Sequence, residues 1–158
     1  MNITVVRSLK LFVLYCSTSF SHDELAEVIR AEDGDEVKII GLPCSGKVDM
    51  LYLVKAFEKG ADGLMLLTCP KNECRHLEGN LRALRRADGL NSILEESGLG
   101  NERMAVISLK EDGLAGIASE AAEFISKLRY ITLNPAGLSV SDVSAVSRQV
   151  KSENIFCK

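Results

Sequence analysis

The stretch Leu64-Met65-Leu66-Leu67-Thr68-Cys69-Pro70-Lys71-Asn72-Glu73-Cys74-Arg75 decides the fold. An apolar run stops at one cysteine, and a second cysteine follows after four intervening residues. Continuous apolar runs are typical of parallel strands that are covered on both faces. The stretch therefore predicts a buried strand whose carboxyl end carries Cys69, with Cys74 at the start of the helix that follows.

The same alternation of apolar strand and amphipathic helix extends over most of the chain. Strands are expected at four segments rich in apolar residues, 10–16, 36–42, 63–68 and 104–109. A helix is expected after each of them, at about residues 22–32, 47–59, 74–97 and 114–128. Strand and helix alternating four times predict an α/β domain with a small, doubly wound parallel sheet of about four strands, of the flavodoxin or Rossmann-like kind.

Turn and capping signals refine these elements. Ser21 or Asp23 is expected to cap the first helix, and Gly60 is expected to end the second. The third helix carries two apolar stripes, and Asp88-Gly89 is expected to divide it between them. These stripes comprise Leu77, Leu81 and Leu84, then Leu90, Ile93 and Leu94.

Length and composition restrict the class of protein. A chain of 158 residues with 46% hydrophobic residues indicates one domain with a sizeable core, and the absence of Trp makes that core aliphatic. We expect an α/β domain over residues 1–134 and a helical tail over 135–158. The net charge of −3 without a basic stripe argues against a nucleic-acid partner.

The apolar run Leu11–Tyr15 is too short to span a membrane. The charged Lys10 interrupts the apolar stretch near the N-terminus, which argues against a signal peptide. We therefore expect a cytoplasmic protein with no membrane partner. The chain contains five cysteines. In a reducing compartment, cysteines indicate metal binding or catalysis rather than disulfide bonds.

Three cysteines occupy equivalent places in the predicted sheet. Cys16, Cys44 and Cys69 each follow a strand, and the carboxyl ends of parallel strands share one edge. Neighbouring strands lie about 4.8 Å apart, so these three sulfurs and that of Cys74 can gather around one small object. Four thiolates suit a tetrahedral zinc ion or an iron–sulfur cluster. Cys157 lies far from this pattern and is expected to be no ligand.

Several segments resemble one known family. Leu42-Pro43-Cys44-Ser45-Gly46-Lys47-Val48-Asp49 resembles the Pro-Cys-Ser-Gly-Arg-Val-Asp motif of the delta subunit of methyl-viologen-reducing hydrogenase. The segment from Ala56 to Gly63 matches the sequence that follows the motif in that family. Cys69 and Cys74 correspond to its Cys-x4-Cys, and Gly79-Asn80 and Arg85-Arg86 also fit. The resemblance covers about residues 11–109.

The resemblance implies a small α/β domain that carries one [2Fe–2S] cluster. It implies an electron-transfer subunit that performs no bond chemistry itself and relays electrons between a hydrogenase, or another oxidoreductase or dehydrogenase, and the flavoprotein component of heterodisulfide reductase. The family usually has a Cys-x-x-Cys motif after the first strand, whereas Ser19 stands here at the second place. The ligands implied are Cys16, Cys44, Cys69 and Cys74.

Three other interpretations remain open at this point. Cys69 and Arg75 satisfy the Cys-x5-Arg spacing of thiol phosphatases, although the loop lacks glycine. His76 beside Cys74 could complete a Cys3His zinc site in an interaction domain. Finally, a run of arginines along one helix fits either a solvated face or a surface that docks an acidic partner. These arginines are Arg75, Arg82, Arg85 and Arg86.

Overall fold

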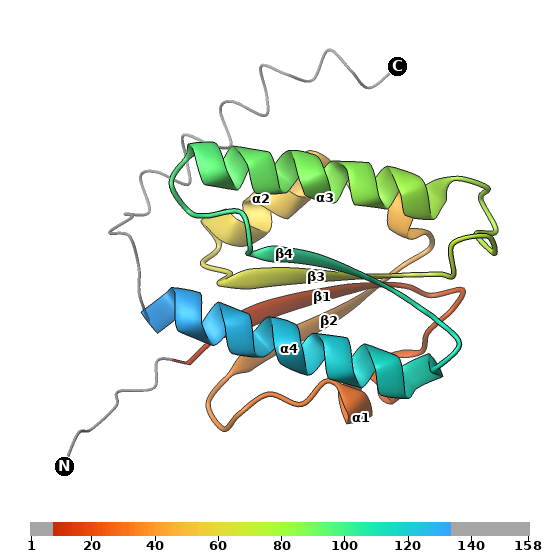
Figure 1. The fold of residues 1–158 in the computed structure, drawn as a ribbon, viewed down its shortest axis with the longest axis horizontal. Helices are drawn as coiled ribbons and strands as arrows, with labels where there is room; N and C mark the ends of the chain where they lie inside the picture. Colours follow the sequence, from red (N-terminus) through yellow and green to blue (C-terminus); the bar gives the residue numbers. More distant parts are fainter. Residues whose placement is uncertain (1–7, 134–158) are drawn as a thin grey trace.

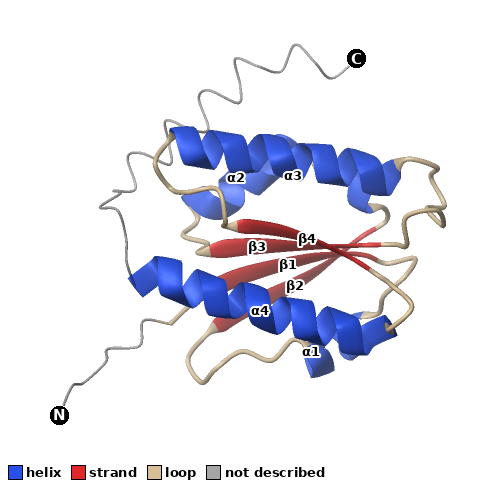
Figure 2. Ribbon diagram, viewed as in Figure 1, coloured by secondary structure: helices blue, strands red, loops and turns tan. Residues whose placement is uncertain are grey.

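Four parallel strands form one sheet in the order β2-β1-β3-β4. They are β1 (Lys10–Cys16), β2 (Glu36–Leu42), β3 (Gly63–Thr68) and β4 (Met104–Ser108). The computed structural model describes residues 8–133, so the predicted tail at 135–158 and Cys157 lie outside the described residues. Helices α2 (Met50–Glu58) and α3 (Gly79–Glu96) cover one face of the sheet (Figures 1 and 2). Helices α1 (His22–Val28) and α4 (Gly113–Leu133) cover the other. This arrangement confirms the predicted doubly wound α/β fold.

The two central strands, β1 and β3, contribute side chains to both halves of the core. Along β1, Phe12 and Leu14 belong to the cluster under α2 and α3, whereas Val13 and Tyr15 belong to the cluster under α1 and α4. Because successive side chains of a strand point to opposite faces, a strand that is apolar throughout serves both clusters. All six residues of β3 are buried for the same reason.

Helices α1 and α2 begin at side-chain caps. Ser21 is the cap of α1 (His22–Val28), one of the two residues that the sequence predicts, and it forms a reciprocal capping box with Glu24. The helix ends before the predicted boundary because Ile29 takes an extended conformation. Asp49 caps α2 (Met50–Glu58), so the predicted start near residue 47 is wrong: a short 3-10 turn, η1 (Ser45–Lys47), precedes it.

Helix α3 (Gly79–Glu96) differs from the sequence prediction at both points where a boundary was expected. Residues 75–78 form turns and bends, so Cys74 precedes the helix by five positions. The helix also runs without a break through Asp88 and Gly89. A glycine in a helix interior costs only about 1 kcal/mol relative to Ala. At Gly89 the missing side chain leaves room for the methyl group of Met50.

In the first turns of α3, the face that packs on the sheet also differs from the predicted one. Ala83, Ala87, Leu90 and Leu94 are buried against the sheet. The predicted first stripe is solvent-exposed, with exposed fractions of 87% for Leu77, 36% for Leu81 and 46% for Leu84. Small alanines at the contact let α3 lie close to the strands, and the leucines are left on the outer face. Helix α4 (Gly113–Leu133) packs Ile117, Ala121 and Leu128 on the other side of the sheet.

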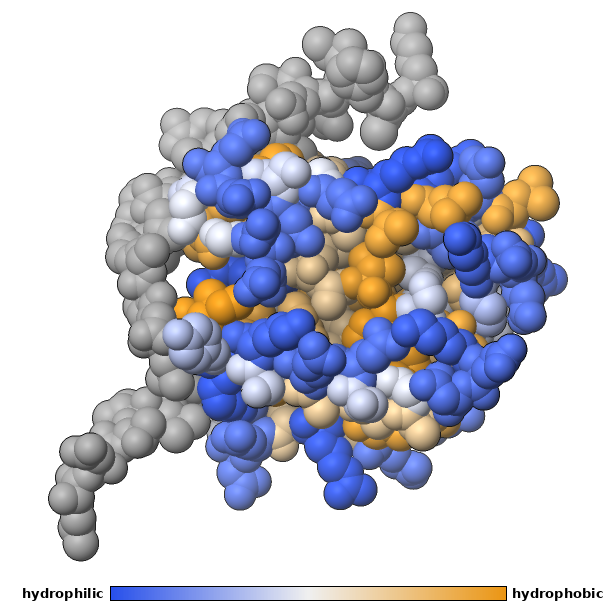
Figure 3. Space-filling view, viewed as in Figure 1, coloured by the Kyte–Doolittle hydropathy of each residue, from blue (hydrophilic) through white to orange (hydrophobic). Residues whose placement is uncertain are grey.

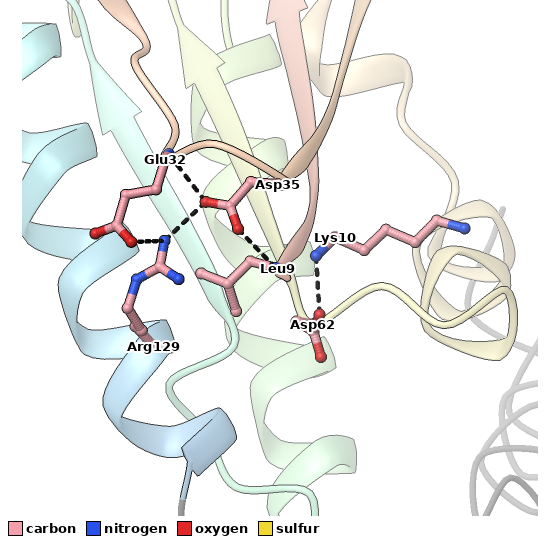
Figure 4. A network of polar contacts seen from close by, with 6 residues as sticks. All are labelled: Leu9, Lys10, Glu32, Asp35, Asp62 and Arg129. Atoms are coloured by element: carbon pink, nitrogen blue, oxygen red, sulfur yellow. Dashed lines mark hydrogen bonds and ion pairs between the residues drawn. The ribbon is translucent and has the colours of Figure 1, made fainter. Parts of the chain in front are cut away.

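A polar network closes the amino edge of the sheet (Figure 4). Asp35 accepts hydrogen bonds from the backbone N–H of Leu9 (2.8 Å) and from Arg129 Nη2 (2.7 Å), so it ties β1, β2 and α4 together. Asp62 accepts from the backbone N–H of Lys10 (2.8 Å) and joins β3 to β1. We call the Asp35–Arg129 pair the amino-edge clasp. None of the helices in residues 8–133 has the length and apolarity needed to cross a bilayer.

Candidate functional site

The strand register places three cysteines at the carboxyl edge of the sheet. Cys16 is the last residue of β1 and pairs with Leu42, the last residue of β2. Cys44 therefore lies two residues beyond this level. Tyr15 pairs with Leu67, so Cys69, two residues after Leu67, lies just past the same edge. In Figure 1 these strand ends lie on the right, where α3 also begins. We call this region the cysteine corner.

Cys44 and Cys74 meet at the first residue of α3. A β-carbon built on Gly79 would lie 2.5 Å from Sγ of Cys44 and 3.0 Å from Sγ of Cys74. Both sulfurs therefore contact the Gly79 backbone, although the two cysteines come from different loops. Both cysteines lie in positions that are largely withdrawn from solvent: Cys44 is buried and Cys74 is half-buried.

Cys69 connects this pair to Cys16. The thiol of Cys69 donates a hydrogen bond to the sulfur of Cys74, and Cys16 is close enough to act on it electrostatically. Burial, that hydrogen bond and the charges on Cys74 and Cys16 raise the pKa of Cys69 to about 12. Like charges that crowd together disfavour ionisation, which is the behaviour of thiols gathered in one place without a cation.

Cys74 shows the opposite behaviour. Burial acts to raise its pKa, but the backbone N–H groups of Asn80, His76 and Gly79, together with the Cys69 thiol, lower it below the ordinary value. Three N–H groups directed at one sulfur stabilise the thiolate, which is the form that binds metals. An inert buried cysteine in an apolar core lacks such donors. The turn before α3 is thus shaped around the sulfur of Cys74.

Asn80 fixes the loop between Cys69 and Cys74. Its buried side-chain amide donates to the carbonyl oxygens of Pro70 and Lys71, each at 3.0 Å. The loop therefore folds back against the first turn of α3. In the sequence, Asn80 stands out only through the family resemblance, because a helix-start asparagine is usually an exposed cap.

Arg86 fixes the turn that carries Cys44. Its Nη1 donates to the carbonyl oxygens of Gly46 and of Val48, the latter at 2.5 Å. Arg86 is half-buried, whereas Arg75, Arg82 and Arg85 are exposed. Arg86 therefore belongs neither to a solvated face nor to a docking surface, the two roles that the sequence left open for these arginines. It holds η1 against α3, and only the other three remain available to a partner.

Two further features of the corner are an unpartnered buried hydroxyl and a close contact between two glycines. The hydroxyl oxygen of Ser45 is fully buried and has no hydrogen-bond partner within the described residues, which is rare for a buried polar atom. Gly46 lies so near Gly79 that a β-carbon would be 2.5 Å from its Cα, so the backbone of both loops approaches the sulfurs directly. As they stand, the side chains of residues 8–133 include no set of three or more His, Cys, Asp or Glu residues arranged for one metal ion.

The alternative sites receive less support from the geometry. A thiol nucleophile needs a lowered pKa, whereas that of Cys69 is raised to about 12, and Arg75 is exposed to solvent. His76 is exposed as well, and only its backbone N–H reaches Cys74. These observations argue against a phosphatase loop at Cys69 and against His76 as a fourth zinc ligand.

Comparison with known proteins agrees with the resemblance seen in the sequence. The family model described as methyl-viologen-reducing hydrogenase, delta subunit, matches residues 12–132. The chain is 33% identical over 122 residues to the D-type iron-sulfur subunit of the vhu F420-non-reducing hydrogenase of Methanocaldococcus jannaschii, covering 77% of this chain and 86% of that protein. The protein of the same name from Methanococcus maripaludis is 30% identical over 124 residues, covering 78% and 92%.

A second kind of relative is much longer. The A-type subunit of the ferredoxin:CoB-CoM heterodisulfide reductase of Methanosarcina mazei is 26% identical over 113 residues. The match covers 72% of this chain but only 14% of that protein. A domain similar to this chain thus occurs as a small part of an A-type heterodisulfide reductase subunit.

Proposed function

Because the chain belongs to the family of the methyl-viologen-reducing hydrogenase delta subunit, we propose that it is an electron-transfer subunit of a hydrogenase–heterodisulfide reductase complex. In this proposal a [2Fe–2S] cluster is held by Cys16, Cys44, Cys69 and Cys74. It relays electrons between a hydrogenase, or another oxidoreductase, and a heterodisulfide-reductase-type flavoprotein subunit. When bound, such a cluster takes up and releases one electron at a time.

One observation carries the proposal. Loops after three different strands, together with the turn before α3, bring four thiols to one corner in which backbone N–H groups are directed at a sulfur. Hydrogen bonds to the sulfurs are among the features by which a protein sets the potential of an iron–sulfur cluster. A [2Fe–2S] cluster binds its four cysteines through two irons. The four sulfurs therefore need not all lie within bonding distance of one atom, as they must around a single tetrahedral ion.

The chain's own residues would each have a defined part. Cys74 enters as a thiol whose pKa is lowered, since N–H donors already stabilise its thiolate. Asn80 and Arg86 hold the two loops in register with α3. Ser45 offers a buried hydroxyl that is free to donate to a sulfur. Burial of Cys16, Cys44 and Cys69 keeps water away from the centre.

The test is a visible and electron-paramagnetic-resonance spectrum of the full chain purified without oxygen, with iron and sulfide assays. We expect a brown protein with two irons and two sulfides per chain. Serine substitution of Cys16, Cys44, Cys69 or Cys74 should each bleach it, and Cys157→Ser is the matched control that should not. If the protein is colourless and contains zinc, the four cysteines form a structural zinc site and the cluster proposal is overturned. A requirement for Cys157 but not Cys16 would overturn the ligand assignment.

A further inference from the structure

An exposed apolar surface adjoins the cysteine corner. Three of the five large apolar side chains that are exposed within residues 8–133 lie in one eight-residue stretch, at Leu77, Leu81 and Leu84. Leu81 and Leu84 are nearly one turn apart on the first half of α3, and Leu77 lies in the turn before it. We call these three residues the leucine patch. Figure 3 shows apolar side chains gathered over the end of the molecule where α3 begins, bordered by hydrophilic ones.

The backbone at Leu77 is strained. Its φ of 61° makes it the one residue other than glycine with a positive φ within residues 8–133. A left-handed backbone is unfavourable for a leucine, and such outliers are concentrated at functional sites. The turn nevertheless carries a leucine there, and it leaves 87% of that residue exposed to water. Packing within the domain does not explain this side chain, because it packs against almost nothing.

Charge around the leucine patch is of one predominant sign. Residues 75–86 contain four arginines and a single carboxylate, Glu78, in a chain whose net charge is −3. Arg86 is engaged with Gly46 and Val48, which leaves Arg75, Arg82 and Arg85 exposed beside the leucines. None of these three forms an ion pair with the described part of the chain. An apolar centre with a charged rim is the usual anatomy of a protein–protein interface.

We propose that the leucine patch and its three arginines form the docking surface for the electron-exchange partner, a protein that presents an apolar patch bordered by carboxylates. This inference rests on the proposed function, because Leu77 lies between Cys74 and Gly79, so a protein seated on it comes close to the cysteine corner. The occupant is the heterodisulfide-reductase-type flavoprotein. In the longer relatives, which are named as heterodisulfide reductase components, a domain similar to this chain is part of the same polypeptide, so the two parts are held at a high effective concentration of each other.

The experiment measures binding of the full chain, purified without oxygen, to the heterodisulfide-reductase-type flavoprotein from the same organism, by surface plasmon resonance at low and high salt. Leu77→Asn and Leu81→Asn should each weaken binding about tenfold or more, as anchor residues at an interface centre do. Paired substitution of Arg82 and Arg85 by Gln should lower the association rate at low salt and flatten its salt dependence. The matched control is Ala122→Asn, on an exposed position of α4 across the sheet.

A stability measurement separates docking from folding. Asn tolerates a left-handed backbone better than Leu does, so Leu77→Asn should leave Tm unchanged or raise it while binding falls. Iron content is measured on every variant. Normal iron together with unchanged binding of the leucine variants would overturn the docking surface and leave the electron-transfer proposal intact. Absence of iron in the wild type would overturn the electron-transfer proposal, whereas the binding measurements would still test the docking surface. No wild-type binding to the flavoprotein, or self-association through the leucines in sedimentation experiments, would overturn the choice of occupant.

Discussion

Gly46 and Gly79 are packed backbone against backbone, with room for no side chain on either. A β-carbon on Gly46 would lie 2.5 Å from the Cα of Gly79. One on Gly79 would lie between the sulfurs of Cys44 and Cys74. The contact joins the turn after β2 to the start of α3, so it determines how near the cysteine-bearing loops can come. The geometry of the corner therefore depends on these two residues having no side chain.

The first prediction concerns this contact. Gly79→Ala should force the two sulfurs apart, lower the free energy of unfolding by about 1–3 kcal/mol as overpacking does, and reduce iron uptake. Gly89→Ala, in the same helix, is the matched control. Its new methyl group meets only the flexible end of Met50 at 3.2 Å, and a helix-interior alanine gains up to about 1 kcal/mol over glycine. Equal iron content and equal Tm in the two variants would contradict the role assigned to Gly79.

A second prediction tests Arg86 against its neighbour. Arg86→Ala removes the guanidinium that holds the carbonyl oxygens of Gly46 and Val48. Loss of hydrogen bonds to a charged donor should cost about 1.5–3 kcal/mol in chemical unfolding. Arg86→Lys should lose only part of this unfolding free energy, because an ammonium group keeps the charge but lacks the planar guanidinium that spans two carbonyl oxygens. Arg85→Ala, at an exposed position, should change the unfolding free energy by less than about 0.5 kcal/mol.

The amino-edge clasp gives a pH dependence. Burial acts to raise the pKa of Asp35, but hydrogen bonds from Leu9, Arg129 and Glu32 lower it below its ordinary value of 3.8. A carboxyl group with a lowered folded-state pKa stabilises the protein above its unfolded pKa. That contribution is fully present at neutral pH and is lost as the pH falls from about 4 through the lower, folded-state pKa.

Asp35→Asn should therefore lower the free energy of unfolding at pH 7 by about 1–3 kcal/mol, and its stability should fall less steeply in acid than that of the wild type. The measurement is urea unfolding between pH 7 and pH 3. Asp33→Asn, at an exposed residue two positions away, is the control and should follow the wild-type curve. Parallel acid profiles for Asp35→Asn and the wild type would show that the clasp does not titrate as described.

Replacing each of two serines near the corner by alanine should change the stability of the protein in opposite directions. The Ser45 hydroxyl is buried without a partner in the described residues. Removing it from the metal-free protein by Ser45→Ala should leave stability unchanged or raise it by about 1 kcal/mol. The Ser17 hydroxyl donates to the carbonyl oxygen of Leu42 at 3.0 Å, so Ser17→Ala should cost about 0.5–1.5 kcal/mol. Thermal unfolding of the two variants side by side checks this, and a loss at Ser45 would indicate a partner for its hydroxyl.

Strands were the most predictable part of this fold. Residues 10–16, 36–42 and 63–68 are segments rich in apolar or β-branched residues, and the three strands have those limits in the structure. Their shared direction follows from the helices between them, which is why the common edge of Cys16, Cys44 and Cys69 could be inferred from sequence. The position of a cysteine relative to the end of a strand depends on a few neighbouring residues, so it can be predicted from the local sequence.

The start of α3 could not be inferred in the same way. Leu77, Leu81 and Leu84 have helical spacing, so periodicity alone assigns them to a helix that packs inward. The buried face instead consists mainly of small residues, Ala83 and Ala87, which carry little hydrophobic signal. The turn at 74–78 depends on N–H contacts to a sulfur and on Asn80, and Arg86 depends on carbonyls about forty residues earlier. Such contacts are tertiary and leave no local pattern.

The amino-edge clasp and the cysteine corner lie at opposite ends of the same strands. Because the two ends share no loops, substitutions around the cysteine corner leave the contacts of the amino-edge clasp in place, and the sheet stays closed at that end. This separation makes the domain portable. A unit that is closed at one end and functional at the other can be appended to a larger polypeptide with its working end outward.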